Sequence, residues 1–309
     1  MDNTDASVVV VIVTFNNQET IAACLNSVLE NKLTQVIVVD SASTDDTREL
    51  VRQKYAAVNL ISLPNNVGFA AGNNLGIELA LKEHPTYILI LNPDTVLLPG
   101  ALSALVAAAQ HHHQRGIFGP QILRGSDPYV LWSAGGEIDP KRYTAGLIGY
   151  NQPVGPSFEK ETVCDFVSGT CMLISAALFS FRIRFFAPYF LYYEDVEFCL
   201  WAKRFRGFSV YVPQAKILHQ ETSASGERLQ AKSYYLARNH LLFVERCAPF
   251  GVKLRELARL PKTLAEHIGS QDLPAVIGIK DYFLRHFGHY ENTKHQSRTQ
   301  APAHSDASS

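Results

Sequence analysis

The stretch Tyr87–Thr95, Tyr-Ile-Leu-Ile-Leu-Asn-Pro-Asp-Thr, decides the fold of this chain. Its first five residues are apolar without alternation, and a polar break follows at Asn92, Pro93 and Asp94. Such a run predicts a strand that is buried on both faces, and strands of this kind form parallel sheets covered by helices. These sheets bind ligands beyond the carboxyl ends of their strands. We therefore expect Asn92 and Asp94 at a binding edge, where Asp94 would hold a metal ion against a diphosphate.

Strands and helices alternate along the chain before this stretch. Apolar runs predict the strands, and apolar residues at the helical period predict the helices. Ser43 is expected to cap the second helix, with Asp45 and Asp46 in its first turn, where negative charge favours the helix dipole. This alternation implies right-handed crossovers and a parallel sheet. The predicted strands are Val8–Thr14, Val36–Val39 and Val58–Leu63, and the predicted helices begin at Gln18, Ser43 and Phe69.

The pattern loosens after Asp94. Residues 125–161 are rich in Gly, Pro and Tyr and have no clear period, which in a compact domain suggests functional loops. The later predicted strands are Gly116–Leu123, Cys171–Ile174, Phe208–Val212 and Ala215–Leu218. The later predicted helices are Pro99–Gln110, Glu194–Phe205, Leu229–Val244, Lys253–His267 and Ala275–Phe287.

The composition predicts a globular protein. The chain has 309 residues, 47% hydrophobic and 18% charged, and its net charge of -1 gives no field that would attract nucleic acid. Its five cysteines include no Cys-x-x-Cys pair, which favours reduced thiols and a reducing compartment. The acidic N-terminus does not resemble a signal peptide, and no apolar run approaches the roughly 20 residues of a membrane span. We expect a cytoplasmic protein.

The turn after the first strand excludes two common phosphate sites. Residues 14–19 contain no glycine, whereas a dinucleotide fold needs G-x-G-x-x-G there, and the phosphate loop G-x-x-x-x-G-K-[ST] is also absent. Bound phosphates would have to be neutralised differently, and a divalent cation with a carboxylate is the usual means. Asp40 follows the second predicted strand, Asp94 follows the fourth, and Asp195 lies at the start of a later predicted helix, and together we expect them to define one edge of the sheet.

An ordered set of motifs resembles the family 2 inverting glycosyltransferases, which have the GT-A fold, an α/β fold with a mainly parallel sheet flanked by helices. These motifs are Thr14-Phe15-Asn16, Val39-Asp40-Ser41-Ala42-Ser43-Thr44-Asp45, Asn65-Asn66-Val67-Gly68-Phe69-Ala70, Asn92-Pro93-Asp94-Thr95 and Tyr193-Glu194-Asp195. Later pieces are most similar to the rhamnosyltransferase-like branch, namely Gly169–Ile174, Tyr192–Leu200, His219 and Tyr234–Phe243.

The resemblance implies a nucleotide-sugar site. Asp40 would accept the N3–H of a uracil or thymine ring, because a carboxylate is only an acceptor and therefore suits an imide donor. The alternative is that Asp40 caps the following turn at Ser43 or Thr44. Gly68 would let the backbone approach ribose or phosphate, whereas Gly72 and Gly76 could equally serve helix-to-sheet packing. The full implied set is Thr14, Phe15, Asn16, Asp40, Ser41, Asn66, Gly68, Asn73, Asn92 and Asp94.

The resemblance also implies a Mg²⁺ or Mn²⁺ site. Asn92-Pro93-Asp94 departs from the Asp-x-Asp motif of many GT-A enzymes, and a single carboxylate binds a hard cation weakly. His219 is the expected second ligand, and an imidazole would favour Mn²⁺. The alternative is a histidine whose nitrogens are satisfied by the backbone.

The implied general base is Asp195, with Glu194 as its helper. In an inverting transfer the acceptor hydroxyl attacks the anomeric carbon directly, and a base must take its proton. The alternative is that both carboxylates only favour the dipole of a helix start. Weaker acceptor-binding candidates are Trp132, Tyr192, Tyr193 and Arg238. The alternative for Trp132 is a place in the core, and the alternative for Arg238 is a solvated helix face.

We therefore expect an inverting glycosyltransferase that moves L-rhamnose from dTDP-L-rhamnose onto a saccharide or lipid-linked saccharide in bacterial surface polysaccharide synthesis. Alternatives are another UDP- or dTDP-sugar, or a non-catalytic relative that binds nucleotide or saccharide. Basic and apolar residues after Val252 predict an amphipathic helix that either packs on the main domain or contacts an anionic membrane at its cytoplasmic face. The expected domains are an extension (1–7), the GT-A domain (8–245, with halves 8–123 and 124–245), C-terminal helices (246–290) and a disordered tail (291–309).

Overall fold

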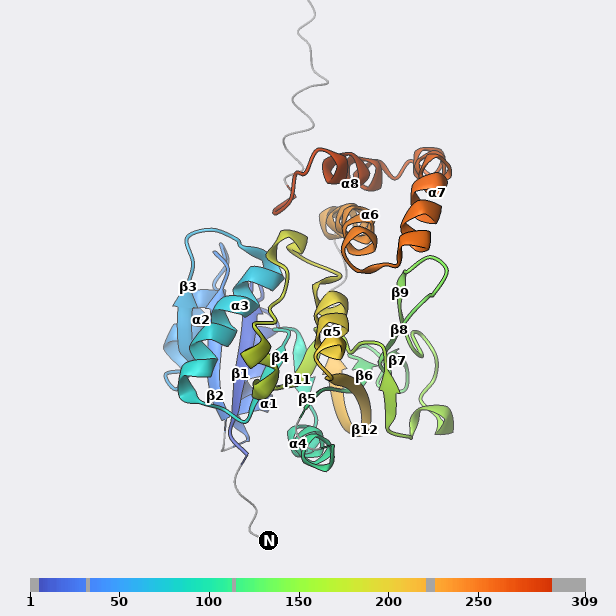
Figure 1. Ribbon diagram of the computed structural model, residues 1–309. Coiled ribbons are helices and arrows are strands. Elements are labelled where there is room, and N and C mark those ends of the chain that lie inside the picture. The colour runs from blue at the N-terminus through green and yellow to red at the C-terminus, as the bar shows by residue number, and fades with distance from the viewer. Residues whose placement is uncertain (1–5, 32–33, 113–114, 221–225, 291–309) are drawn as a thin grey trace, which may run out of the picture.

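The computed structural model describes residues 6–31, 34–112, 115–220 and 226–290. The predicted disordered tail and most of the predicted N-terminal extension lie outside these residues. In the described part, β4 (Tyr87–Leu91) lies inside a ten-stranded sheet, and C-terminal helices form a separate layer above it in the view of Figure 1.

The predicted parallel strands form one half of the sheet. The strand order there is β4-β1-β2-β3, and every neighbouring pair is parallel. β1 and β4 have the predicted limits, whereas β2 is longer and β3 shorter than predicted. The first three strands are β1 (Val8–Thr14), β2 (Thr34–Asp40) and β3 (Asn59–Ser62).

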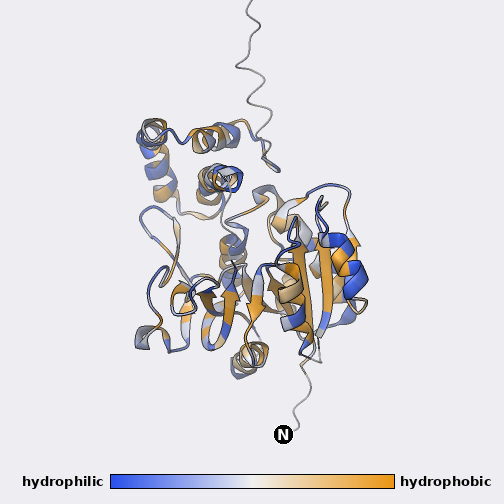
Figure 2. Cartoon of the chain, turned by 180° about the vertical axis from the view of Figure 1, so that it is seen from behind, coloured by the Kyte–Doolittle hydropathy of each residue, from blue (hydrophilic) through white to orange (hydrophobic). Residues whose placement is uncertain are grey.

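Strand β1 is buried on both faces, as a run of seven buried residues requires. Val8, Val10 and Ile12 pack into one core cluster, and Val9, Val11 and Val13 into another. Because successive side chains point to opposite faces, each cluster needs its own layer of helices. Figure 2 shows the apolar strands between helices. The first cluster includes residues of α1 (Ile21–Leu29), α2 (Thr47–Lys54) and α4 (Ala101–His111), and the second residues of α3 (Gly68–Ala80) and α5 (Glu194–Arg204).

Two glycines let α3 approach β1 closely. A Cβ on Gly72 would lie 2.8 Å from Cγ1 of Val13, and a Cβ on Gly76 would overlap Cγ1 of Val11. The packing alternative therefore accounts for both glycines without a ligand.

The other half of the sheet is mixed. The antiparallel strand β11 (Cys171–Ser175) joins β4 to β6 (Gly116–Arg124), and β6 runs parallel to β12 (Phe208–His219). The two strands predicted at 208–218 are thus one strand, because a register shift between Val212 and Lys216 absorbs the Pro213 interruption. Short elements escaped prediction: β5 (Thr95–Leu97), β7 (Leu131–Ser133), β8 (Gly136–Ile138), β9 (Ala145–Leu147), β10 (Thr162–Cys164) and the 3₁₀ turns η1 (Leu81–Glu83), η2 (Pro156–Phe158), η3 (Ala176–Phe181) and η4 (Ala187–Tyr189).

The predicted capping role of Ser43 is wrong. Helix α2 begins at Thr47, three residues later than that cap requires, and its N-cap is Asp46. The Ser43 hydroxyl instead accepts the backbone N–H of Asn16, and Asp45 accepts the backbone N–H of Thr47. These side-chain bonds stabilise a turn in place of a first helical turn, which is the usual competition offered by Ser and Asp.

Three helices follow the sheet: α6 (Gly226–Cys247), α7 (Phe250–Gly269) and α8 (Leu273–Phe283). Helix α6 continues two residues past the predicted boundary at 245 and contributes Leu242, Phe243 and Cys247 to the sheet-side core. Only Val252 and Glu256 of α7 are buried. Among the described residues, no helix combines the length and apolarity that a membrane crossing requires.

Candidate active site

A cavity of about 730 Å³ lies beyond the carboxyl end of β4. The start of α5, the end of β12, the loops around β7 and β9, and the first half of α6 form its walls. This is the sheet edge at which open α/β folds bind ligands. Eight of the predicted site residues meet there: Asn92, Asp94, Trp132, Tyr192, Tyr193, Glu194, Asp195 and His219.

Strand pairing brings Asp94 and His219 together although they are far apart in sequence. β5 pairs antiparallel with the end of β12, so that Thr95 lies opposite His219, and the backbone N–H of Gln220 donates to the carbonyl of Asp94 over 2.7 Å. Nε2 of His219 lies 3.3 Å from Oδ1 of Asp94. The ring of Trp132 stands edge-on to that of His219, with centroids 4.7 Å apart. Trp132 is therefore a cavity residue and is only partly buried.

The donor set at this edge fits a divalent cation that is completed by a diphosphate. Within the described chain, the buried Oδ1 atoms of Asp94 and Asn92 accept no hydrogen bond, and Oδ1 of Asp94 has only its contact with Nε2 of His219. Two cis ligands of an octahedral ion, each at about 2.1 Å, lie about 3 Å apart, close to the observed Asp94–His219 separation. No cluster of three or more His, Cys, Asp or Glu residues suited to a metal occurs in the described segments. Diphosphate and water would have to supply the remaining ligands.

Asp195 and Glu194 begin α5 on the cavity wall. Oδ2 of Asp195 accepts the Gly169 N–H over 2.8 Å, and Oδ1 accepts its own turn's Val196 N–H over 2.8 Å. Burial raises the pKa of Asp195, and these two N–H groups partly offset that effect. Burial, followed by the charge of Asp195, raises the pKa of Glu194 well above its usual value, and Oε2 of Glu194 has no partner among the described residues. Asp195 therefore ionises before Glu194.

The loop before α5 has an uncommon backbone. Phe190, Tyr192 and Tyr193 have φ angles of 67°, 69° and 75°, a region that non-glycine residues rarely adopt. The buried amide of Asn239 donates to the carbonyls of Tyr189, Leu191 and Tyr192 over 3.0, 2.7 and 2.9 Å. This side chain holds the loop in a conformation that local preferences oppose.

Arg238 does not line the cavity, contrary to its proposed contact with an acceptor. It is fully buried, and its guanidinium donates to the carbonyls of Tyr189 and Gly288 and to Oδ1 of Asn239. The alternative, a solvated helix face, is also wrong for this residue. Arg238 connects the loop before α5 to the chain after α8.

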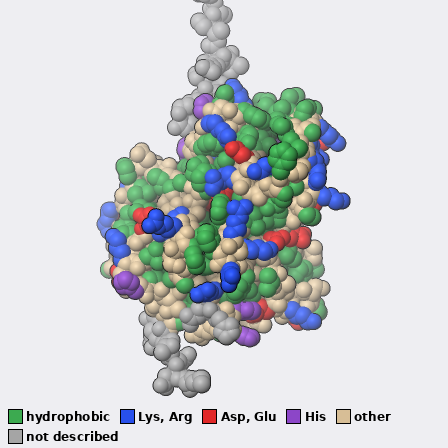
Figure 3. Space-filling model, viewed as in Figure 1, with side chains coloured by type: hydrophobic (Ala, Val, Ile, Leu, Met, Phe, Trp, Pro, Cys, Tyr) green, Lys and Arg blue, Asp and Glu red, His purple; other side chains and the backbone are tan. Residues whose placement is uncertain are grey.

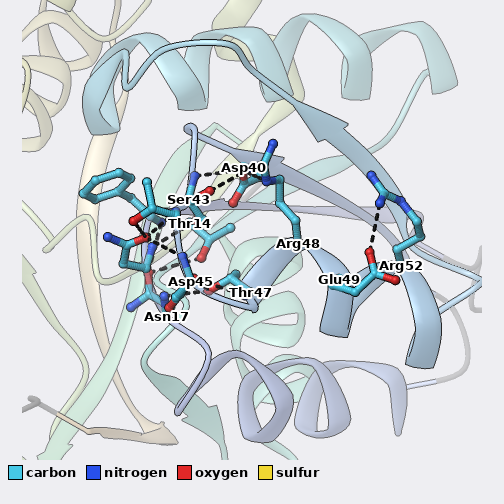
Figure 4. Close-up of polar contacts among 12 residues, drawn as sticks. Thr14, Asn17, Asp40, Ser43, Asp45, Thr47, Arg48, Glu49 and Arg52 are labelled. Carbon is cyan, nitrogen blue, oxygen red and sulfur yellow. Dashed lines mark hydrogen bonds and ion pairs between the residues drawn. The ribbon is translucent and has the colours of Figure 1, made fainter.

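A second group of predicted residues lies at the ends of β1 and β2 and not on the cavity wall (Figure 4). Thr14 and Asp40 are opposite each other in the parallel register. Oδ1 of Asp40 accepts the Ser43 N–H over 3.1 Å and lies 3.3 Å from Nε of Arg48. Oδ2 of Asp40 is buried and has no partner in the described residues. Asp40 thus caps the turn with one oxygen and keeps the other available as an acceptor.

The remaining members of this group mostly hold loops. Oδ1 of Asn16 accepts the Thr44 N–H over 2.8 Å, and Ser41 donates to Asn66 over 3.1 Å. Gly68 has φ +79°, and a Cβ there would lie 2.5 Å from the ring of Phe190. The backbone conformation and the packing against Phe190 therefore require a glycine at this position even without a ligand. Three further members differ in exposure: Asn73 is buried and donates to the Phe69 carbonyl, Thr14 is buried and donates to Asn17, and Phe15 is 40% exposed.

Several residues of the two groups escaped prediction. Arg48 follows Asp40 by eight residues, and no spacing rule linked them. The amide of Gly169 had a signal, since it begins a matched motif, but its contact with Asp195 is a backbone contact that side-chain types do not report. Cations also line the cavity, at Arg124, Arg228 and Lys232. Arg228 and Lys232 could have been found from their spacing of four residues, which places them on one face of a helix.

Comparison with known proteins identifies relatives of this architecture. Residues 9–180 match the family model described as Glycosyl transferase family 2. An N-acetylglucosaminyl-diphospho-decaprenol L-rhamnosyltransferase of Mycobacterium tuberculosis is 28% identical over 230 residues, which cover 66% of this chain and 71% of that protein.

Solved structures share the fold. TarS 1–349 of S. aureus, in complex with UDP-GlcNAc, gives a TM-score of 0.57 at 16% identity, over 89% of this chain and 80% of that one. The mannosyltransferase PcManGT of Pyrobaculum calidifontis, in complex with GDP-Man and Mn²⁺, gives 0.54 at 18% identity, over 87% and 77%. Against a longer TarS structure the match spans 43% of that chain. The predicted GT-A fold is confirmed. Since the family model covers more than half of the sequence, and the solved structures share its fold, this chain belongs to glycosyl transferase family 2.

Proposed function

We propose that the chain transfers L-rhamnose from dTDP-L-rhamnose, with inversion, onto a saccharide or lipid-linked saccharide acceptor of bacterial surface polysaccharide synthesis. The observation that carries the proposal is the cavity itself, where a carboxylate suited to be a base faces the same space as Asp94 and His219. The rhamnose donor and the lipid-linked acceptor are supported by the named activity of the mycobacterial relative.

Asp195 is the proposed general base. The acceptor hydroxyl forms a bond to the anomeric carbon while the bond to the nucleotide diphosphate breaks on the opposite side, and the hydroxyl proton passes to the Asp195 carboxylate. The raised pKa of Asp195 makes it a stronger base than an exposed aspartate. The Gly169 N–H fixes its orientation. Trp132, Tyr192 and Tyr193 are the proposed acceptor contacts, since all three line the cavity.

Asp94 and His219 are the proposed ligands of Mg²⁺ or Mn²⁺. Such an ion supplies positive charge that stabilises the departing diphosphate. The cations at Arg124, Arg228 and Lys232 would add to that field from the protein side. The Mn²⁺ present with the mannosyltransferase relative supports a divalent ion for this fold.

The nucleotide base is proposed to lie at the β1 and β2 ends, with Oδ2 of Asp40 accepting its imide N–H. That oxygen is buried and lacks a donor within the described residues, a state that costs free energy until a donor arrives. Uracil and thymine both carry this donor, so Asp40 does not distinguish UDP- from dTDP-sugars.

A panel of donors tests the assignment. The chain with Mn²⁺ is incubated with dTDP-L-rhamnose, dTDP-glucose, UDP-glucose and UDP-galactose, and release of nucleoside diphosphate is measured. Preferential turnover of dTDP-L-rhamnose is expected. A clear preference for UDP-glucose or UDP-galactose would remove rhamnose and leave a transferase of another sugar.

A non-catalytic relative is the second candidate, because Asn92 replaces the first carboxylate of the Asp-x-Asp motif. In that case nucleotide would bind with ordinary affinity while no donor of the panel turned over, with or without acceptor.

We place the reaction in the cytoplasm, which suits the five unpaired cysteines.

A further inference from the structure

Helix α7 exposes an apolar stripe to solvent. We define the outer stripe as Phe250, Leu254, Leu257, Pro261, Ala265 and Ile268, all of them exposed. Successive members are three or four residues apart, so they lie on one face of the helix. The exposed fractions are large, at 74% for Phe250, 61% for Leu257 and 61% for Ile268. The stripe runs the length of α7, about 27 Å at the helical rise.

The protein does not use this face for its own core. Val252 and Glu256 are the buried residues of α7, and at about 100° per residue they lie on the side opposite to the outer stripe. A surface helix normally turns its apolar face inward, whereas α7 turns one outward. Leu273, Phe283 and Leu284 at the ends of α8 are also exposed. Figure 3 shows apolar side chains gathered at the upper right, where α7 and α8 lie in Figure 1.

Two lysines flank the outer stripe. At about 100° per residue, Lys253 and Lys262 lie on its two sides, whereas Arg259 lies on the buried side near Val252 and Arg255 donates to the Lys141 carbonyl over 2.7 Å. The carboxylates of α7 are Glu256, which is buried, and Glu266, which lies 3.8 Å from Lys262. An apolar stripe with basic flanks is the pattern of helices that lie in the interface of an anionic bilayer. The two flanking lysines disfavour a second copy of the same face, because like charges would meet.

The longest segment outside the described residues differs from the stripe in composition. Residues 291–309 contain no Val, Leu, Ile, Met, Phe, Tyr or Trp. Apolar surfaces of this extent on soluble proteins mark interaction sites.

We propose that α7 binds the surface of an anionic lipid bilayer, with the outer stripe inserted among the lipids and Lys253 and Lys262 against their headgroups. The surface itself does not depend on the proposed transfer reaction. It has a consequence for that reaction: α6 packs against α7 and α8 and also lines the cavity, through Leu229 and Leu236 among others. Helix α6 thus contacts both the helix that is proposed to lie on the bilayer and the cavity that is proposed to bind a lipid-linked acceptor.

Flotation with vesicles tests the proposal. The whole chain is mixed with vesicles of phosphatidylcholine alone or with phosphatidylglycerol added, at low and high salt. Binding is expected only with phosphatidylglycerol, and it should weaken as salt rises. The double variant Leu254→Glu/Leu257→Glu should lose about tenfold or more in vesicle affinity, because charge replaces inserted apolar surface. Lys253→Ala/Lys262→Ala should lose affinity and much of the salt dependence.

The matched control is Val163→Glu, which changes an equally exposed apolar residue on β10, at 66%, outside the C-terminal helices. It should bind vesicles as the unchanged chain does. Donor hydrolysis in solution should be unaltered in the Leu254→Glu/Leu257→Glu protein, which separates this test from that of the proposed function. No binding to anionic vesicles, or equal binding by the glutamate double variant, would overturn the proposal. A dimer by sedimentation that the same double variant converts to monomers, without vesicle binding, would assign the stripe to a second copy.

Discussion

Asp195 and Glu194 are neighbours in sequence but differ in what surrounds their oxygens. Both oxygens of Asp195 accept backbone N–H groups, whereas Oε2 of Glu194 has no partner within the described residues. Like charges this close disfavour double ionisation, so the better-solvated carboxyl takes the charge. This difference favours Asp195 over Glu194 as the proposed base, independently of its place in a motif.

The activity should therefore fall in acid at a pH above that of an ordinary aspartate. Burial raises the pKa of Asp195, and the base must be ionised, so kcat/KM should rise with pH through that raised pKa and fall below it. A pH profile of donor turnover measures this limb. Glu194→Gln should keep most of the activity. An acid limb at or below the usual pKa of about 3.9 would contradict the assignment.

Substitution of the two proposed metal ligands should weaken Mn²⁺ binding to different degrees. A chelator is expected to abolish turnover, and added Mn²⁺ to restore it. His219→Ala should raise the Mn²⁺ concentration needed for half activity by about 10 to 100-fold, and Asp94→Ala by more, because a carboxylate is the stronger ligand of a hard cation. Titration of turnover with Mn²⁺ measures both effects. Activity that survives the chelator would disprove the metal role of the two residues.

At the scale of elements, the loop before α5 positions the two carboxylates that begin this helix. Asn239 on α6 donates to three carbonyls of this loop, and the loop places Tyr193 as the N-cap of α5 directly before Glu194 and Asp195. Misplacement of a reacting group by about 1 Å can cost about a hundredfold in rate.

Asn239→Asp keeps the shape of the side chain and removes its donors. It should lower turnover about tenfold or more, because the carbonyls that Asn239 holds come directly before Glu194 and Asp195. Nucleotide affinity should change by less than turnover, since Asp40 is held by Ser43 and Arg48 instead. Asn74→Asp is the matched control, because Asn74 donates to the Phe185 carbonyl outside the loop. It should lower the melting temperature without the same loss of rate. Equal loss of rate in both variants would make Asn239 a merely structural residue.

The packing of α3 on β1 gives a prediction about stability. Gly76→Ala forces a Cβ against Val11 and should destabilise the fold by about 1 to 3 kcal/mol, the usual cost of overpacking. Gly251→Ala in α7 is the control, since a Cβ there meets nothing within 4 Å and alanine favours helix. It should be neutral or stabilising by up to about 1 kcal/mol. Chemical denaturation measures both, and a neutral Gly76→Ala would refute the close approach.

Elements were predictable where one strong local pattern acts alone. The apolar runs of β1 and β4 fixed both strands to the residue, because burial on both faces leaves no alternative period. The three-residue strands β7 to β9 are too short to show a period. The capping prediction for Ser43 is wrong because its hydroxyl accepts the backbone N–H of Asn16, which is distant in sequence. Local sequence patterns do not report tertiary contacts of this kind.

At the scale of the whole molecule, the site residues form two groups on the two halves of the sheet. The motifs named members of both groups, whereas Arg48, the Gly169 amide and the cavity cations were not predicted, and Arg238 lies outside the cavity and inside the protein. The pairing of Asp94 with His219 depends on β5 meeting β12, which no local pattern shows. We propose that the group around Asp40 binds the nucleotide base and that the group around Asp195 forms the glycosidic bond.

Two isosteric substitutions, measured for donor turnover and for nucleotide binding by calorimetry, test this division most directly. Asp195→Asn should lower turnover by about 10² to 10⁴-fold and leave the nucleotide Kd unchanged, since it removes only the base. Asp40→Asn should weaken nucleotide binding by about tenfold or more, because an amide N–H₂ replaces the acceptor. Full activity of Asp195→Asn, or unaltered nucleotide binding by Asp40→Asn, would contradict the account.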